Sequence, residues 1–333
     1  YYLHLYDVTQ ADLNWRNPSV REELFKVVNF WKNKGVKGFR FDVINVIGKD
    51  EVLEDCPIND GKPAYTDRPI THDYLKMMNN ATFGSEEGFI TVGEMSATTI
   101  DNCILYTAPE RKELSMAFNF HHLKVDYAGG EKWTRAAPDY VELKQIFRHW
   151  QQGMHNRAWN ALFWCNHDQP RIVSRFGDEG EYRVTAAKML AMVLHGMQGT
   201  PYIYQGEELG MTNVAFDRIE DYRDIEILNY YSVATARGQS HADVMASIHA
   251  VGRDNARTPM PWHSGPQAGF TTGQPWIALN PRAFSILTSR ESTSSTLLTL
   301  SSDCFATSMS ISATNASVFT LPRSASMNSN SFL

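Results

Sequence analysis

The sequence has little cysteine, no long apolar run and no excess of positive charge. Only four of its 333 residues are cysteine, and none stands in a CxxC spacing, which is typical of reduced thiols in a cytoplasm. No run of about 18 apolar residues is present, so the sequence predicts no membrane-spanning helix. A net charge of −6 argues against nucleic acid and anionic membrane surfaces as partners.

The first residues, YYLHLYDVTQ, also lack the pattern of a signal peptide. They contain neither a basic n-region nor an apolar h-region. We therefore expect a cytoplasmic protein. The absence of an initiator methionine leads us to expect that the chain is a fragment.

What the sequence does contain is an alternation of β-prone runs with amphipathic segments, up to about residue 210. Asn17 and Pro18 predict a helix start and Gly35 its end. The expected strands are about 36–43, 89–93, 114–118, 161–165 and 200–204, with helices at about 71–82, 98–107, 139–153 and 182–197. This alternation predicts an α/β fold with a parallel sheet covered by helices.

Three acidic residues lie at or just after the ends of these runs: Asp42, Glu94 and Asp168. The carboxyl ends of barrel strands are where such enzymes place their chemistry. Two carboxylates facing one glycosidic bond are the usual requirement for sugar hydrolysis. The sequence therefore predicts a glycosidase site formed by these residues.

The neighbours of the three acids suggest distinct roles. Arg40 stands two residues before Asp42, so both side chains face the same way, and the guanidinium keeps the carboxylate ionised, as a nucleophile requires. Partial burial of Glu94 would raise its pKa and suit it to proton donation. His167 and Asp168 would stabilise the positive charge that develops on the sugar.

Each of these residues also has an ordinary structural interpretation. Asp42 alone could cap a helix or pair with Arg40, Glu94 alone is equally ambiguous, and a single His167 is usually structural. Their occurrence together, in this order, favours catalysis.

Three motifs resemble the α-amylase family of glycoside hydrolases: GFRFD its strand 4, TVGEM its strand 5 and FWCNHDQPR its strand 7. The resemblance implies a TIM-barrel (β/α)8 fold that is incomplete here, with strands 4 to 8 present and strands 1 to 3 missing. It implies Asp42 as nucleophile, Glu94 as general acid/base and Asp168 as transition-state stabiliser, with Arg40 and His167 at the −1 sugar subsite. The family's metal-binding loop is not in the chain, so no metal or other cofactor is expected.

The same resemblance divides the chain. Residues 1–16 look like the exit of an insertion domain and 17–281 like the partial catalytic barrel, in which DNARTPMPW (254–262) looks like a loop leading away. From 282 to 333 a tail rich in Ser and Thr stands where relatives carry a β-sandwich. We expect the tail to be disordered, with a few edge strands as the alternative.

The stretch MAFNFHHLKVDYAGGEKW (116–133) resembles trehalose-6-phosphate hydrolases more than oligo-1,6-glucosidases. A phosphorylated disaccharide carries a charge of about −1.5 to −2 at pH 7, so its pocket needs cationic donors. His121, His122 and Lys124 are therefore expected to bind substrate, with Lys124 on the phosphate and Lys132 nearby. The expected reaction yields glucose and glucose 6-phosphate, although the fragment alone is expected to fold poorly and be nearly inactive.

Three alternatives remain open. The first is an oligo-1,6-glucosidase or other α-glucosidase on the same scaffold. The second is a non-catalytic relative, and the third is a pseudogene-like product without function.

Overall fold

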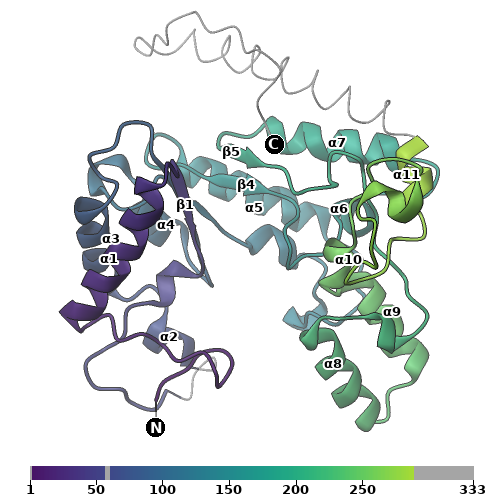
Figure 1. Ribbon diagram of the computed structural model, residues 1–333, viewed down its shortest axis with the longest axis horizontal. Coiled ribbons are helices and arrows are strands. Elements are labelled where there is room, and N and C mark those ends of the chain that lie inside the picture. Colours follow the sequence, from purple (N-terminus) through teal and green to yellow (C-terminus); the bar gives the residue numbers. More distant parts are fainter. Residues whose placement is uncertain (1, 57–60, 289–333) are drawn as a thin grey trace, which may run out of the picture.

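The computed structural model describes residues 2–56 and 61–288, and short parallel strands form its framework (Figure 1). Strands β1 (Gly38–Phe41), β2 (Ile90–Glu94) and β3 (Met116–Phe118) form one sheet in that order. Strands β4 (Ala161–Phe163) and β5 (Thr200–Tyr202) form a second. An isolated parallel bridge from Ala117 to Asn160 links the two sheets.

Helices follow the strands along the chain and lie outside them (Figure 1). The helices around the strands are α1 (Pro18–Asn33), α2 (Lys62–Tyr65), α3 (Pro69–Ala81), α4 (Ile100–Thr107), α5 (Tyr140–Met154), α6 (Ile172–Phe176) and α7 (Arg183–His195). Those that come later are α8 (Ile225–Ala236), α9 (His241–Val251), α10 (Asp254–Arg257) and α11 (Ala283–Thr288).

The local signals read from the sequence explain how α1 begins and ends. The side chain of Asn17 accepts a hydrogen bond from the Ser19 amide, and Pro18 occupies the first helical position. After the helix, Gly35 adopts a φ of +98°, which a residue without a side chain tolerates. The predicted boundaries of α1 are therefore confirmed, and so are the positions of all five predicted strands.

Two main hydrophobic clusters hold the strands and helices together. One lies around the first sheet and contains Leu75, Met95 and Tyr106, each at most 1% exposed. The other surrounds β4 and contains Trp164 and Leu194, also 1% exposed. These side chains fill the space between the strands and the helices that cover them.

The structure corrects two predictions about the later part of the chain. The segment 254–262 does not simply lead away from the barrel, because α10 forms there and its residues 254–256 are fully buried. The tail predicted to be disordered from residue 282 begins with α11, whose Ile286 packs with Leu209 and Met211. The rest of the predicted tail, 289–333, lies outside the described residues.

The single predicted sheet is also divided: β1, β2 and β3 form one sheet and β4 and β5 another, and the isolated bridge noted above links the two. Within 2–56 and 61–288, no helix is both long enough and apolar enough to cross a membrane.

Candidate active site

The first two acidic residues lie at the carboxyl ends of adjacent strands. Phe41, the last residue of β1, pairs with Gly93 of β2, so Asp42 and Glu94 follow at neighbouring positions. Immediately after Asp42, Val43 adopts a left-handed backbone with φ of 38°. This conformation is costly for a β-branched residue, and such strain is concentrated at functional sites. It turns the chain sharply out of the sheet and leaves Asp42 at its rim.

Arg40 joins these two carboxyl groups. Its Nη1 donates to Asp42 Oδ1 at 2.7 Å, and its Nη2 donates to Glu94 Oε2. The Asp42 side chain is 71% exposed, whereas that of Glu94 is 12% exposed. Each of the two carboxyl groups also shifts the pKa of the other. One arginine therefore binds two carboxyl groups that differ strongly in their contact with solvent.

This difference moves the two pKa values apart. Burial raises the pKa of Glu94, and the hydrogen bond and charge of Asp42 raise it further, to about 7. Burial also disfavours the ionised form of Asp42, but hydrogen bonds from Glu94 and Arg40 outweigh it and lower the pKa of Asp42. At neutral pH the pair thus holds one ionised carboxylate beside one carboxyl that can carry a proton.

Asp168 lies in the loop between β4 and α6, and its carboxylate is surrounded by cations. Arg257 Nη2 is 2.8 Å and Arg253 Nη1 is 3.5 Å from Asp168 Oδ1, while His167 Nε2 is 3.4 Å from Oδ2. The charge of Asp168 contributes to the raised pKa of Glu94, and the charge of His167 contributes to the lowered pKa of Asp42. Asp168 therefore acts electrostatically on Glu94, and its neighbour His167 acts on Asp42.

A cavity of about 190 Å³ is lined by Glu94 and by the neighbours of the other two acidic residues, Arg40 and His167. Every described strand contributes a side chain to its lining: Arg40, Glu94, Phe118, Phe163 and Tyr202. His167 and Tyr204 complete the polar part of the wall. The cavity is thus aromatic with a few charged groups, a combination typical of sites for small ligands.

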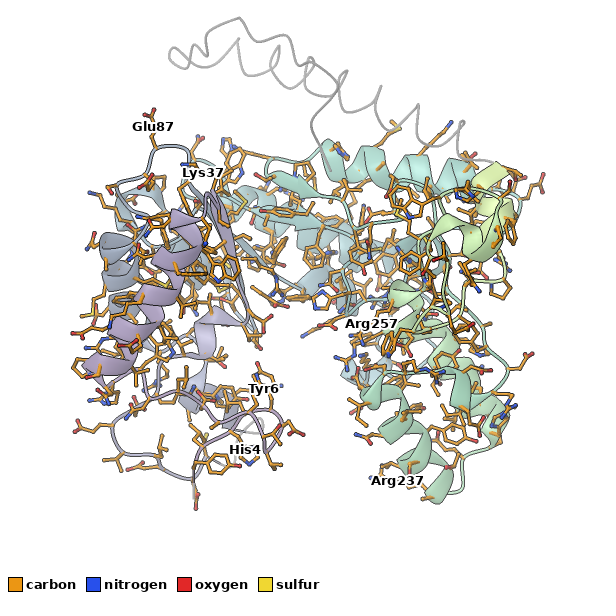
Figure 2. All side chains as sticks on the ribbon, viewed as in Figure 1. His4, Tyr6, Lys37, Glu87, Arg237 and Arg257 are labelled. Atoms are coloured by element: carbon orange, nitrogen blue, oxygen red, sulfur yellow. The ribbon has the colours of Figure 1, made fainter. Side chains whose placement is uncertain are left out.

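Tyr6 also borders the acidic pair, although the sequence analysis did not select it. Burial raises the pKa of its hydroxyl, and the charges of Asp42 and Glu94 raise it further. Figure 2 shows Tyr6 in the segment below β1, with its side chain directed toward the end of that strand. The segment that precedes α1 therefore forms part of the surroundings of the site.

The structure places the residues that were predicted to bind substrate after β3 in different environments. His122 is 6% exposed, and its Nε2 lies 2.8 Å from the carbonyl oxygen of Phe163. Burial lowers the pKa of His122 to about 4, so the ring is neutral at pH 7. The side chain of His122 thus belongs to the core of this structure, and its contact with substrate stays a prediction.

The other members of this group differ in position. His121 Nε2 lies 2.8 Å from the carbonyl oxygen of Thr98, and its ring contacts that of Trp150. Lys124 is exposed on a 3-10 turn. Lys132 places Nζ 2.6 Å from Glu226 Oε2, and Arg253 Nε lies 3.0 Å from the same oxygen. Lys132, rather than Lys124, is thus connected to the charged network around Asp168.

Sequence reasoning missed Arg253 and Arg257 as parts of the site. Arg257 lies in the segment 254–262, which was interpreted as a departing loop, and Arg253 directly precedes it. The spacing of four residues was an available signal, because residues four apart share one face of a helix. In 2–56 and 61–288, no group of three or more His, Cys, Asp or Glu side chains is arranged to hold a metal ion.

Parallel strands with external helices and an acidic cluster at their carboxyl ends define a class of barrel-type enzyme folds. Residues 1–302 match the family model described as "Alpha amylase, catalytic domain". The chain belongs to this family, whose catalytic domain is a (β/α)8 barrel, and the described residues form part of such a barrel.

The chain is also similar to several individual members of this family. The chain is 62% identical over 279 residues to a trehalose-6-phosphate hydrolase of Escherichia coli (strain K12), covering 84% of this chain and 50% of the relative. It is 56% identical over 278 residues to one of Bacillus subtilis (strain 168), covering 83% and 49%. An oligo-1,6-glucosidase of Halalkalibacterium halodurans is 49% identical over 287 residues, covering 84% and 51%. The chain therefore spans about half the length of the curated relatives it matches.

A solved structure gives the same picture. The crystal structure of a Bacillus licheniformis trehalose-6-phosphate hydrolase superposes with a TM-score of 0.87 and 51% identity. The superposition covers 92% of this chain and 56% of that one.

Proposed function

We propose that this chain carries the catalytic residues of a retaining glycoside hydrolase that cleaves trehalose 6-phosphate to glucose and glucose 6-phosphate. The observation that carries the proposal is the pair Asp42 and Glu94, joined by Arg40, with pKa values moved in opposite directions. A nucleophile must be ionised and a general acid protonated, and this pair meets both conditions near neutral pH. The relatives named for trehalose-6-phosphate hydrolysis support the choice of substrate.

In the first half of the proposed reaction, Asp42 attacks the anomeric carbon while Glu94 protonates the departing oxygen. In the second half, Glu94 removes a proton from water, which releases glucose from Asp42. Retaining enzymes hold these groups about 5–5.5 Å apart. Arg40, which donates to both carboxyl groups, holds them side by side at the ends of paired strands.

Asp168 would stabilise the transition state from the opposite wall, with His167 and Arg40 at the −1 sugar subsite. Its carboxylate has cationic partners on Oδ1, while Oδ2 has the His167 ring at 3.4 Å. This geometry suits an anion that holds sugar hydroxyls without itself taking part in proton transfer.

Cationic groups after β3 would recognise the phosphate. We retain Lys124 as the predicted contact and add Lys132, which lies beside Glu226 in the network that reaches Asp168. His121 would border this subsite. The cation–π contact of Lys132 with the Trp133 ring, at 5.2 Å, supports a defined position for its ammonium group.

For the architecture, we propose that β1 to β5 correspond to strands 4 to 8 of the family barrel, with residues 1–16 as the exit of an insertion. The contribution of all five strands to one cavity supports this assignment. No cofactor is part of the proposal. A cytoplasmic location accords with the buried cysteines Cys103 and Cys165, which form no disulfide.

The test measures the release of glucose 6-phosphate from trehalose 6-phosphate, and a coupled dehydrogenase assay detects this product. It is made on this chain and on the chain co-expressed with the part of the Escherichia coli relative that it does not match. Isomaltose is the competing substrate. Release of glucose 6-phosphate supports the proposal, preference for isomaltose would favour an oligo-1,6-glucosidase, and no turnover in either preparation would refute a glycosidase.

A further inference from the structure

The segment between α9 and residue 260 bears directly on Asp168, although it is far away in the sequence. Arg257, at the end of α10, donates from Nη2 to Asp168 Oδ1 at 2.8 Å and from Nε to the carbonyl oxygen of His167 at 2.9 Å. Its third nitrogen, Nη1, lies 3.4 Å from Asp224 Oδ1. One guanidinium thus binds both the side chain of Asp168 and the backbone immediately before it.

The shape of the guanidinium makes this contact specific. Nε and Nη2 lie on the same edge of the planar group, so a single edge spans the peptide oxygen and the carboxylate. A lysine ammonium at the same place is a point charge and cannot make both contacts with fixed geometry. The contact therefore fixes the direction of the carboxylate as well as compensating its charge.

Arg257 extends from a base that is itself held firmly. The three residues before it, 254–256, are fully buried. Arg171, only 1% exposed, donates to the carbonyl oxygens of Asn255 at 3.3 Å and Ala256 at 3.2 Å. Tyr204 donates its hydroxyl to the Ala256 oxygen at 3.0 Å. Such buried and satisfied polar contacts restrict movement of α10, and hence of the Arg257 backbone.

The direction of the side chain agrees with this interpretation. Figure 2 shows Arg257 extending from α10 toward the side of the molecule that carries β1. Arg237, at the far end of α8, is exposed and lies well away from it in the same view. These two arginines therefore make a matched pair of a site residue and a surface residue.

Arg253 does not duplicate this contact. Its Nη2 lies 2.6 Å from Asp224 Oδ1 and its Nε 3.0 Å from Glu226 Oε2, whereas its Nη1 is 3.5 Å from Asp168 Oδ1. Arg253 is thus engaged mainly by two other carboxylates, and the shorter contact with Asp168 comes from Arg257.

We infer that Arg257 is a positioning residue for the reaction, because it holds Asp168 in the orientation that faces the sugar. The inference rests on the proposed function for the meaning of Asp168, but the contact itself does not. It assigns to the buried α10 segment the task of fixing a carboxylate that lies nearly 90 residues earlier in the chain.

The first experiment examines the surroundings of Asp168 without any substrate. The ring resonances of His167 are followed by NMR at one fixed pH in the parent chain and in Arg257→Gln, with Arg237→Gln as the control. Because Arg257 binds both the His167 carbonyl oxygen and the Asp168 carboxylate, its loss should shift the His167 resonances, whereas the control should leave them in place. No shift in folded Arg257→Gln protein, judged by unchanged circular dichroism, would overturn the inference.

The second experiment measures turnover in whichever preparation cleaves trehalose 6-phosphate. Arg257→Gln should lower kcat about 100-fold with a smaller change in KM, since misplacement of a carboxylate by about 1 Å has an effect of this size. Millimolar guanidinium should restore part of this kcat in Arg257→Gln but none in Asp168→Asn. Equal kcat in the parent and the variant would contradict the inference.

Arg257→Lys covers the case in which the Gln variant does not fold. It keeps the charge but loses the two-point contact, so we expect shifted His167 resonances together with a kcat reduced at least 10-fold. Full activity of Arg257→Lys would show that charge alone suffices and would refute a positioning role. If no glucoside is cleaved at all, the proposed function fails, while the NMR result still decides the contact.

Discussion

The carboxyl groups of Asp42 and Glu94, at the ends of two paired strands, both accept hydrogen bonds from Arg40. Asp42 is open to solvent whereas Glu94 is largely buried. The two carboxyl groups thus have pKa values shifted in opposite directions because their surroundings differ. This relationship is the physical basis of the proposed roles.

Replacing Asp42 by Asn should remove nearly all turnover of trehalose 6-phosphate, by at least about 1,000-fold in kcat, because the amide cannot form the covalent intermediate. The coupled assay described above measures this loss. Asp243→Asn, which alters an exposed carboxylate on α9, serves as the control and should keep its activity. Retention of a tenth of the parental kcat by Asp42→Asn would rule out the nucleophile assignment.

Ionisation of Glu94 should lower the free energy of unfolding as the pH rises. Its pKa is about 7 in the folded chain and near its usual value of 4.5 when unfolded, so the folded state keeps a proton that the unfolded state releases. The stabilisation is complete below about pH 4.5 and is lost as the pH rises through about 7.

The non-titrating variant Glu94→Gln should lack this slope. Allowing for partial solvent screening, we expect its free energy of unfolding to gain about 1 kcal/mol on the parent between pH 4.5 and pH 7.5. Urea titrations at several pH values measure the difference. A gap between the two proteins that stays constant with pH would show that the pKa of Glu94 is not raised.

Lys132→Ala should reduce the preference for trehalose 6-phosphate over free trehalose more strongly than Lys124→Ala does. Lys132 belongs to the network with Glu226 and Arg253, and loss of a cation that contacts phosphate removes about 1.5–3 kcal/mol, or roughly a factor of 10 to 100 in kcat/KM. The ratio of kcat/KM for the two sugars is the quantity to compare. If only Lys124→Ala changes the ratio, the phosphate lies nearer the 3-10 turn.

His122→Asn should affect stability and leave substrate selectivity unchanged. The ring is buried with a pKa near 4, so the unfolded state binds an extra proton between about pH 4 and 6.5, and stability falls as the pH is lowered through that range. The variant should lose this pH dependence and about 1–3 kcal/mol of stability at pH 7. Altered discrimination between the phosphorylated and free sugars would return His122 to the binding site.

Ile286→Ala should destabilise the chain by about 2–4 kcal/mol, because Ile286 is fully buried against Leu209 and Met211. Phe284→Ala, on the same helix but with Phe284 50% exposed, is the matched control and should cost less than about 1 kcal/mol. Denaturant midpoints distinguish the two. Equal effects would mean that α11 does not pack on the core.

The sequence predicted the strands and the first helices well because their signals are local. The conformation of the few residues around them depends directly on Asn17, Pro18 and Gly35. The acidic residues follow short, β-prone apolar runs, which are typical of strands. The division of the sheet could not be read in this way, since pairing depends on how distant segments pack.

The errors arose where a side chain's environment comes from elsewhere in the chain. His121 and His122 are neighbours of one residue type, yet only His122 is enclosed by Phe147, Phe163 and Trp164. Arg257 meets Asp168 across 89 positions, a contact that no spacing rule contains. The composition from residue 282 onward suggested disorder. The six residues Ala283–Thr288 nevertheless form α11, in which Ala283 and Ile286 are buried.

The Ala117–Asn160 bridge has a mechanical consequence. Asp42 and Glu94 follow strands of one sheet and Asp168 follows a strand of the other, so the relative positions of the three acids depend on how the two sheets pack across this bridge. A substrate that contacts all three acids would hold the two sheets in a fixed relative position, and it would do so only while it is bound.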